Sequence, residues 1–201
     1  MRLHGSCQCG KVRFSVESTT PYPYQFCYCS ICAKTSGALT CNIMGARDSL
    51  RVSGKPHLRC YHAVMREPGK RATRSPGERW FCADCGSHLY VLDERWPEGV
   101  WPNAAVIDTE LPVPPEHVQL MMNYKPDWVP TVADGPRYPE LPELSIADWH
   151  AQHELTVAAG GKPARRAPQR TPARNRPAAR KRQTAPKRRA TGAKRRAAAK
   201  Q

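Results

Sequence analysis

The chain has 201 residues, and its 20 prolines and 13 glycines indicate a loop-rich fold of one domain or a modest pair. Half of its 32 Lys and Arg lie in residues 161–201, which contain no acidic residue. Residues 1–160 contain the other 16 together with all 17 acidic residues, so this part of the chain is nearly neutral. The N-terminus lacks the apolar core of a signal peptide and no apolar run could cross a bilayer, so we expect a cytoplasmic protein without a membrane span.

The first predicted elements lie around the cysteine-rich segments of the N-terminal quarter. Alternating apolar and polar residues predict a half-buried strand over residues 10–17. Two prolines keep residues 21–26 extended. We expect Ser30 to cap a short helix that continues to Lys34 and is ended by Gly37.

The middle of the chain is typical of a β protein with short strands between turns. Residues 67–78 are polar and contain two Pro-Gly pairs, which predicts a mobile loop. An amphipathic helix is predicted over residues 144–155, with Leu144, Ala147, Ala151 and Leu155 on its apolar face. Strands are predicted at 39–44, 49–53, 57–64, 80–82, 88–92 and 100–107.

Residues 161–201 have a composition of their own. They contain no large apolar residue, so burial cannot offset the entropy lost on ordering, and we expect a disordered tail. Its Lys and Arg clusters can neutralise phosphates, which predicts non-specific, salt-dependent binding of nucleic acid. A solvated tail without a partner and contact with anionic lipid are the alternatives.

Seven of the nine cysteines fall into three tight clusters, and thiolates at this spacing can share one tetrahedral zinc. The odd count and the lack of an export signal favour metal or redox chemistry over disulfides. The clusters are Cys7 with Cys9, Cys27 with Cys29 and Cys32, and Cys82 with Cys85.

Two of the clusters are pairs, and together they can form a closed four-sulfur zinc site from Cys7, Cys9, Cys82 and Cys85. Such a metal would connect the start of the fold to its middle. The alternative is that each pair binds another partner or stays free.

The remaining triplet, Cys27, Cys29 and Cys32, can hold a second zinc and leave one coordination position free. Zinc in such a site can lower the pKa of a bound water or thiol and so provide a nucleophile at neutral pH. We expect Cys41 and Cys60 to be buried as small hydrophobes, and His62 and His88 to be surface or hydrogen-bonded residues. The alternative is a closed site with a fourth ligand such as Cys41, Cys60, His62 or His88.

The cluster order and spacing resemble the glutathione-dependent formaldehyde-activating enzyme family, which also contains centromere protein V. The resemblance covers about residues 1–150. It is carried by residues 5–10, 27–32 followed by Ser36-Gly37, 79–89, 115–117 and 125–128.

The resemblance implies a mainly β, Mss4-like zinc-binding fold with short helices over residues 1–150. After it we expect a helix end and linker at 151–160 and the tail at 161–201. It implies two Zn²⁺ per chain: a structural ion at the four paired cysteines and a catalytic ion at the triplet. The family's activity is the joining of glutathione and formaldehyde to S-hydroxymethylglutathione, classed as a carbon–sulfur lyase in reverse. Tyr28 is a departure, because many members have His there.

We therefore expect a zinc-dependent carbon–sulfur lyase that acts on the adduct of an aldehyde with glutathione or another thiol. The alternative is a non-catalytic zinc-stabilised module that delivers the basic tail to nucleic acid.

Overall fold

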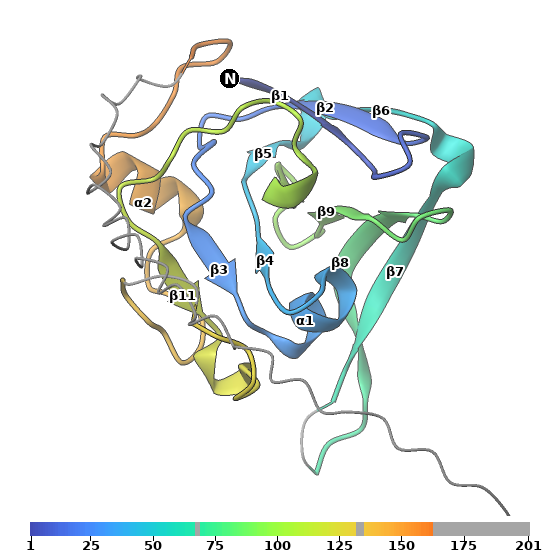
Figure 1. The fold of residues 1–201 in the computed structure, drawn as a ribbon, viewed down its shortest axis with the longest axis vertical. Coiled ribbons are helices and arrows are strands. Elements are labelled where there is room, and N and C mark those ends of the chain that lie inside the picture. Colours follow the sequence, from blue (N-terminus) through green and yellow to red (C-terminus); the bar gives the residue numbers. More distant parts are fainter. Residues whose placement is uncertain (67–68, 132–134, 163–201) are drawn as a thin grey trace, which may run out of the picture. The chain divides into compact units, whose positions relative to one another are not determined.

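The computed structural model describes residues 1–66, 69–131 and 135–162. Over these residues the chain is built mainly of β-strands, with two short α-helices (Figure 1). The prediction of a mainly β fold with short helices is confirmed. The predicted disordered tail lies, from residue 163 on, outside the described residues, and the predicted domain boundaries stay a prediction.

The first sheet contains the segment that leads into the first cysteine pair. Its strands are antiparallel and follow the order β1 (Arg2–Ser6), β2 (Arg13–Glu17) and β6 (Arg51–Ser53). Leu3, Phe14 and Val16 point into the core, and Ser15 between the last two is also buried. The strands at 10–17 and 49–53 are therefore present in shortened form.

The second sheet carries the last cysteine pair. Its five strands follow the order β5 (Gly45–Ala46), β10 (Gly99–Pro102), β9 (His88–Leu92), β8 (Thr73–Cys82) and β7 (Leu58–Met65). Strand β9 has the predicted bounds and β7 is shifted by one residue from the predicted 57–64. The strand predicted over 100–107 stops at Pro102, and a 3-10 turn follows at Ala104–Val106.

The loop predicted over residues 67–78 is wrong from Thr73 onwards, since these residues are the first half of β8. Pro76 lies where the register with β7 shifts, between the pairs Arg74–Val64 and Glu78–His62. On its other side, β8 pairs with β9 only from Glu78 onwards, so Pro76 lies outside that pairing. A proline is tolerated there because no regular ladder hydrogen bond is lost.

The third sheet positions the cysteine triplet. Parallel β11 (Val118–Leu120) and antiparallel β4 (Thr40–Cys41) flank β3 (Gln25–Cys27). Helix α1 (Ser30–Ser36) connects β3 to β4 and ends at Gly37 (Figure 1). Further 3-10 turns lie at Arg47–Ser49, Lys55–His57 and Met122–Tyr124.

The C-terminal helix α2 (Ile146–Gln152) is shorter than predicted, and its buried face is a different one. Ala147 and Ala151 are exposed, whereas Trp149 and His150 are buried. Trp149 stacks on Tyr24 with ring centroids 3.7 Å apart. The burial of Trp149 therefore sets the orientation of the helix, and the spacing of the two alanines does not.

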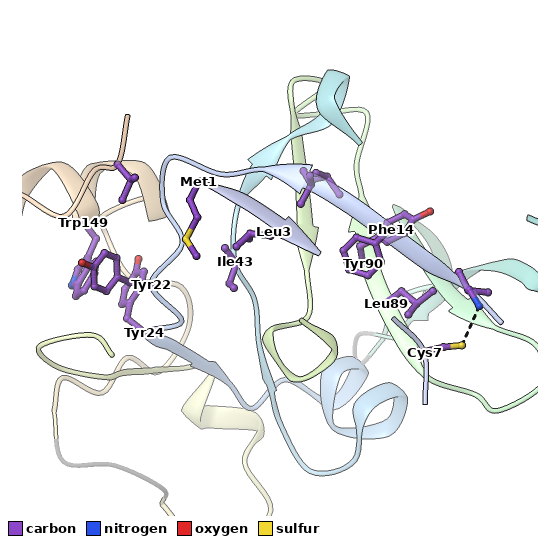
Figure 2. Close-up of a cluster of buried hydrophobic side chains, with 14 of the residues drawn as sticks. Met1, Leu3, Cys7, Phe14, Tyr22, Tyr24, Ile43, Leu89, Tyr90 and Trp149 are labelled. Atoms are coloured by element: carbon purple, nitrogen blue, oxygen red, sulfur yellow. Dashed lines mark hydrogen bonds between the residues drawn. The ribbon is translucent and has the colours of Figure 1, made fainter. Parts of the chain in front are cut away.

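The hydrophobic core reaches directly to the first cysteine pair (Figure 2). Phe14 and Tyr90 meet edge to face at 5.6 Å, and Leu89 is fully buried beside them. Cys7 and Cys82 belong to the same cluster, with 2% and 0% of their surfaces exposed. Metal ligands at these positions would therefore be anchored in the most rigid part of the fold.

Candidate metal centres

Four cysteines from two distant segments come together in one cluster. The sulfurs of Cys7, Cys9, Cys82 and Cys85 lie within 4.8 Å of one another and could hold a metal ion. The Cys7–Cys9 and Cys9–Cys82 sulfurs are 3.4 and 3.7 Å apart. Zinc–sulfur bonds of about 2.3 Å at tetrahedral angles place sulfurs about 3.8 Å apart. The arrangement therefore fits a four-thiolate site.

Two similar tight turns present these cysteines. After β1, Gly10 adopts a φ of 74° and its N–H donates to the carbonyl of Cys7 at 2.9 Å. After β8, Gly86 adopts a φ of 73° and its N–H donates to the carbonyl of Cys82 at 2.8 Å. Both turns need this left-handed conformation, which costs glycine little.

Hydrogen bonds at this cluster favour the thiolate form that a metal requires at Cys7 and Cys85, whereas burial and the neighbouring cysteines raise the pKa of the Cys9 thiol to about 12. The backbone N–H of Val12 donates to the Cys7 sulfur at 3.2 Å. The Ser87 side chain and backbone lower the pKa of the Cys85 thiol to about 5. The Ser87 hydroxyl also accepts from the N–H of Gln8 at 3.0 Å, which connects the two turns.

The sulfurs of Cys27, Cys29 and Cys32 form a second cluster, also within 4.8 Å of one another. Cys27 is the last residue of β3, and Cys29 caps α1, with its sulfur accepting from the N–H of Cys32 at 3.3 Å. The expectation that Ser30 is the cap is wrong by one residue. A thiolate here takes the role that Ser or Asp oxygens have at other helix starts.

Within the triplet, the hydrogen bonds concentrate negative charge on Cys29. Contacts with Cys27 and Cys32, followed by the backbone N–H groups of Cys32 and Ile31, lower the pKa of Cys29 to about 2. The contacts with Cys29 and Cys32 raise the pKa of Cys27. The pKa of Cys32 is raised overall: Cys27 acts to lower it, Cys29 and burial raise it, and the positive charge of Arg79 acts to lower it.

None of the four alternative ligands completes the triplet. In the part of the chain that the structure describes, no fourth His, Cys, Asp or Glu offers a ligand atom within 4.8 Å of all three sulfurs. Cys41 pairs with Phe26 and so lies on the face of the ladder opposite to Cys27. Cys60 lies on β7 and is exposed, so its expected burial is wrong; Cys41 is partly buried.

The two histidines have hydrogen-bond partners of their own. His62 Nδ1 lies 3.0 Å from the carbonyl of Ser75. His88 Nδ1 lies 3.1 Å from the Ser36 hydroxyl, and the ring is only 5% exposed. The sequence predicted a hydrogen-bonded or surface role for both, but it contained no signal for the deep burial of His88, because the partner Ser36 is 52 positions away.

Two depressions in the surface lie away from both clusters. One of about 430 Å³ is lined by Ala46, Arg47, Asp48, Pro97 and Glu98, and the other lies over β1, β2 and β6. No cysteine lines either depression, so the candidate site is identified by its donor atoms.

Comparison with known proteins identifies the family. Residues 2–123 match the family model described as "Glutathione-dependent formaldehyde-activating enzyme". The chain belongs to this family.

A relative from Halomonas elongata, named "Putative glutathione-dependent formaldehyde-activating enzyme", is 47% identical over 156 residues, covering 76% of this chain and 96% of that protein. A crystal structure of a Rhodobacter sphaeroides protein is 27% identical and covers 54% of this chain and 91% of its own, with a TM-score of 0.42. Membership of the glutathione-dependent formaldehyde-activating family agrees with the resemblance seen in the cysteine clusters.

Tyr28, the departure from the pattern of many family members, is fully buried. Its hydroxyl donates to Gln119 Oε1 at 3.4 Å, and its backbone N–H donates to the carbonyl of Leu120. Tyr28 therefore helps hold β3 against β11. None of the helices in the described part of the chain has the length and apolar character needed to cross a bilayer.

Proposed function

We propose that this chain is a zinc-dependent enzyme that joins glutathione, or a related thiol, to formaldehyde. In the reverse direction it is a carbon–sulfur lyase acting on S-hydroxymethylglutathione. Family membership supports the thiol and the aldehyde. The observation that carries the proposal is the convergence of three thiolates without a fourth ligand among the described residues.

The proposed ligand sets follow the two clusters. Cys7, Cys9, Cys82 and Cys85 hold a structural zinc, and Cys27, Cys29 and Cys32 hold the second. The donor chemistry fits, because thiolates are preferred ligands of zinc and three of them leave a position for an exogenous ligand. A zinc ion bound there supplies Lewis acidity that keeps an incoming thiol in its thiolate form.

The surrounding protein defines how a substrate reaches the triplet. Cys32 is buried, whereas Cys27 and Cys29 are partly exposed, so the cluster is approached on the side of these two sulfurs. In the forward reaction the substrate sulfur attacks the aldehyde carbon and the C–S bond forms. The electron pair of the C=O π bond moves to oxygen, which then takes up a proton.

Metal analysis and exchange kinetics test this function with a matched pair of variants. Wild-type protein should contain two zinc ions per chain and accelerate the exchange between free glutathione and its formaldehyde adduct, followed by NMR. Cys29→Ser should lose this acceleration and keep the structural ion. Cys60→Ser, an exposed cysteine outside both clusters, should keep both properties.

Zinc-edge X-ray absorption supplies an independent measurement. Added glutathione should bring a fourth sulfur to one of the two ions. A triplet zinc whose fourth position is taken by a protein side chain, unchanged by glutathione, would contradict the proposal.

The basic segment 161–201 supports an additional role in non-specific nucleic-acid binding. We also propose a cytoplasmic location. Nearly all of this segment lies outside the described residues, so the role is carried by composition alone. Truncation after residue 160 should abolish salt-dependent DNA binding and leave glutathione–formaldehyde exchange unchanged. DNA binding that survives truncation would contradict it.

A further inference from the structure

A small set of buried polar atoms has no hydrogen-bond partner among the described residues. Buried polar groups in proteins nearly always have partners, so each such atom calls for an explanation. Three of the five belong to residues that surround the cysteine triplet, namely Thr40, Arg79 and His88, which we call the polar cluster. The atoms are Glu17 Oε2, Thr40 Oγ1, Asn42 Oδ1, Arg79 Nη1 and His88 Nε2.

His88 is held next to the triplet by helix α1. Its Nδ1 is committed to the Ser36 hydroxyl at 3.1 Å. Ser36 follows Cys32 by four residues on α1, so the two side chains share one face and lie about 5–6 Å apart at Cβ. The other ring nitrogen, Nε2, is buried and unpartnered, in a side chain that contacts the residue one helical turn after Cys32.

Thr40 reaches the triplet from the neighbouring strand. It pairs directly with Cys27 in the antiparallel β3–β4 ladder. Residues paired in this way point to the same face, with Cβ atoms about 5 Å apart. Thr40 is only 2% exposed, so no bulk water is available to its unpartnered hydroxyl.

Arg79 adds a positive charge to the same surroundings. Burial and then the charge of Arg79 lower the pKa of His88 to about 4, so the imidazole is neutral at neutral pH. Arg79 also acts electrostatically on Cys32. The guanidinium is therefore close to both the histidine ring and the triplet.

We propose that the polar cluster binds the oxygen atom of the thiol–aldehyde adduct, with His88 Nε2 as its principal hydrogen-bond partner. This inference rests on the proposed function of the triplet. The adduct's hydroxyl can donate and accept, so a neutral histidine in either tautomer can bond to it. Arg79 stabilises the negative charge that forms on this oxygen when the C–S bond forms, and Thr40 completes its hydrogen bonding.

Cys27 and Cys29 are partly exposed, whereas the unpartnered atoms of the polar cluster are buried. Ser36 is a positioning residue, because it acts only through the His88 ring.

Two stable ligands of nearly equal size test the inference: S-(methoxymethyl)glutathione has an oxygen one carbon from sulfur, as the adduct does, and S-propylglutathione has a methylene group in that place. Affinities for the zinc-loaded full chain are measured by isothermal titration calorimetry. Wild-type protein should bind the oxygen-containing compound about fivefold more tightly, as expected for one hydrogen bond. His88→Phe, with a ring of similar size, should remove that preference.

The matched control is His62→Phe, a histidine bonded to the Ser75 carbonyl and outside the polar cluster, which should retain the preference. Thr40→Val removes one hydroxyl at nearly constant volume and should reduce the preference. It also serves as the test if His88→Phe does not fold, as judged by circular dichroism and zinc content.

The outcomes separate the two proposals. Wild-type protein that binds both ligands equally overturns the polar cluster and leaves the proposed function standing. Wild-type protein that binds neither ligand overturns the polar cluster, and if it also fails to accelerate the glutathione–formaldehyde exchange, both proposals are overturned. A preference that survives in both His88→Phe and Thr40→Val shows that the oxygen is recognised elsewhere and overturns the inference.

Discussion

The proposed structural zinc should act as a long-range crosslink, and replacing one exposed ligand measures its strength. Cys9→Ser is the suitable change, because Cys9 is exposed and its loss leaves no cavity, unlike Cys7 or Cys82. The segment from Cys9 to Cys82 spans 74 residues. For a loop of that length, the crosslink model lowers the unfolded-state entropy by an amount worth about 4 kcal/mol at 25 °C.

The assay is urea unfolding of zinc-loaded protein, followed by tryptophan fluorescence. With an m value of about 2 kcal/mol/M, Cys9→Ser should lower the midpoint by about 2 M. EDTA should lower the wild-type midpoint similarly and change the variant much less. The control Cys60→Ser, also exposed, should stay within about 0.5 kcal/mol of wild type.

The triplet provides a second comparison. Cys27 to Cys32 closes only six residues, for which the same model gives about 2 kcal/mol. Cys29→Ser should therefore destabilise the fold less than Cys9→Ser. Equal midpoints for Cys9→Ser and wild type in the presence of zinc would refute the crosslink.

Three further predictions concern the scaffold. Burial lowers the pKa of His150 to about 4, and its Nε2 accepts from a backbone N–H, so His150 should contribute up to about 3 kcal/mol to the loss of stability as pH drops from 6.5 to 4, measured by urea midpoints. The lowered pKa of His88 adds to the loss in the same range. Trp149→Ala should cost about 3–5 kcal/mol in thermal or urea unfolding, because it removes the stack on Tyr24. Gly54→Ala should lower the melting temperature more than Gly37→Ala does, because only the Cβ at Gly54 would overlap a backbone carbonyl.

The sign of the pH effect follows from the protonation states. The unfolded chain binds a proton at His150 below about pH 6.5, whereas the folded chain does not until about pH 4, so stability is full above 6.5 and is lost below it. His150→Gln should flatten this dependence, and an unchanged slope would contradict the assignment. A loss below 1 kcal/mol in Trp149→Ala would show that the helix contributes little. Gly54 and Gly37 both have a φ of 76°. If the two alanine variants lower the melting temperature equally, the backbone strain that they share explains the loss, and the overlap predicted at Gly54 is wrong.

The sequence by itself determined the chemistry of the candidate site, because ligand type and local spacing are properties of short segments. The pairs at Cys7 and Cys82 and the triplet at Cys27 are each defined within six residues. Local turn chemistry likewise predicted the role of Gly37. Family membership follows from the same motifs.

Other local patterns were overridden by partners distant in sequence. Proline and glycine predicted a loop before Glu78, but pairing with β7 makes a strand of residues from Thr73 on, with the proline at a register shift. Alanine periodicity predicted one face of α2, and stacking of Trp149 on Tyr24 selected another. Cys60 appeared apolar from its neighbours, yet its strand lies at the edge of the sheet and its side chain is exposed.

The tertiary structure alone decided what surrounds the triplet. Thr40 faces Cys27 through strand register, and His88 reaches Ser36 across 52 positions. Such contacts depend on how three sheets fold against one another, and no short window of sequence encodes them. The donor atoms of this site are therefore readable from the chain, whereas the buried atoms that would receive a substrate's oxygen are created only by folding.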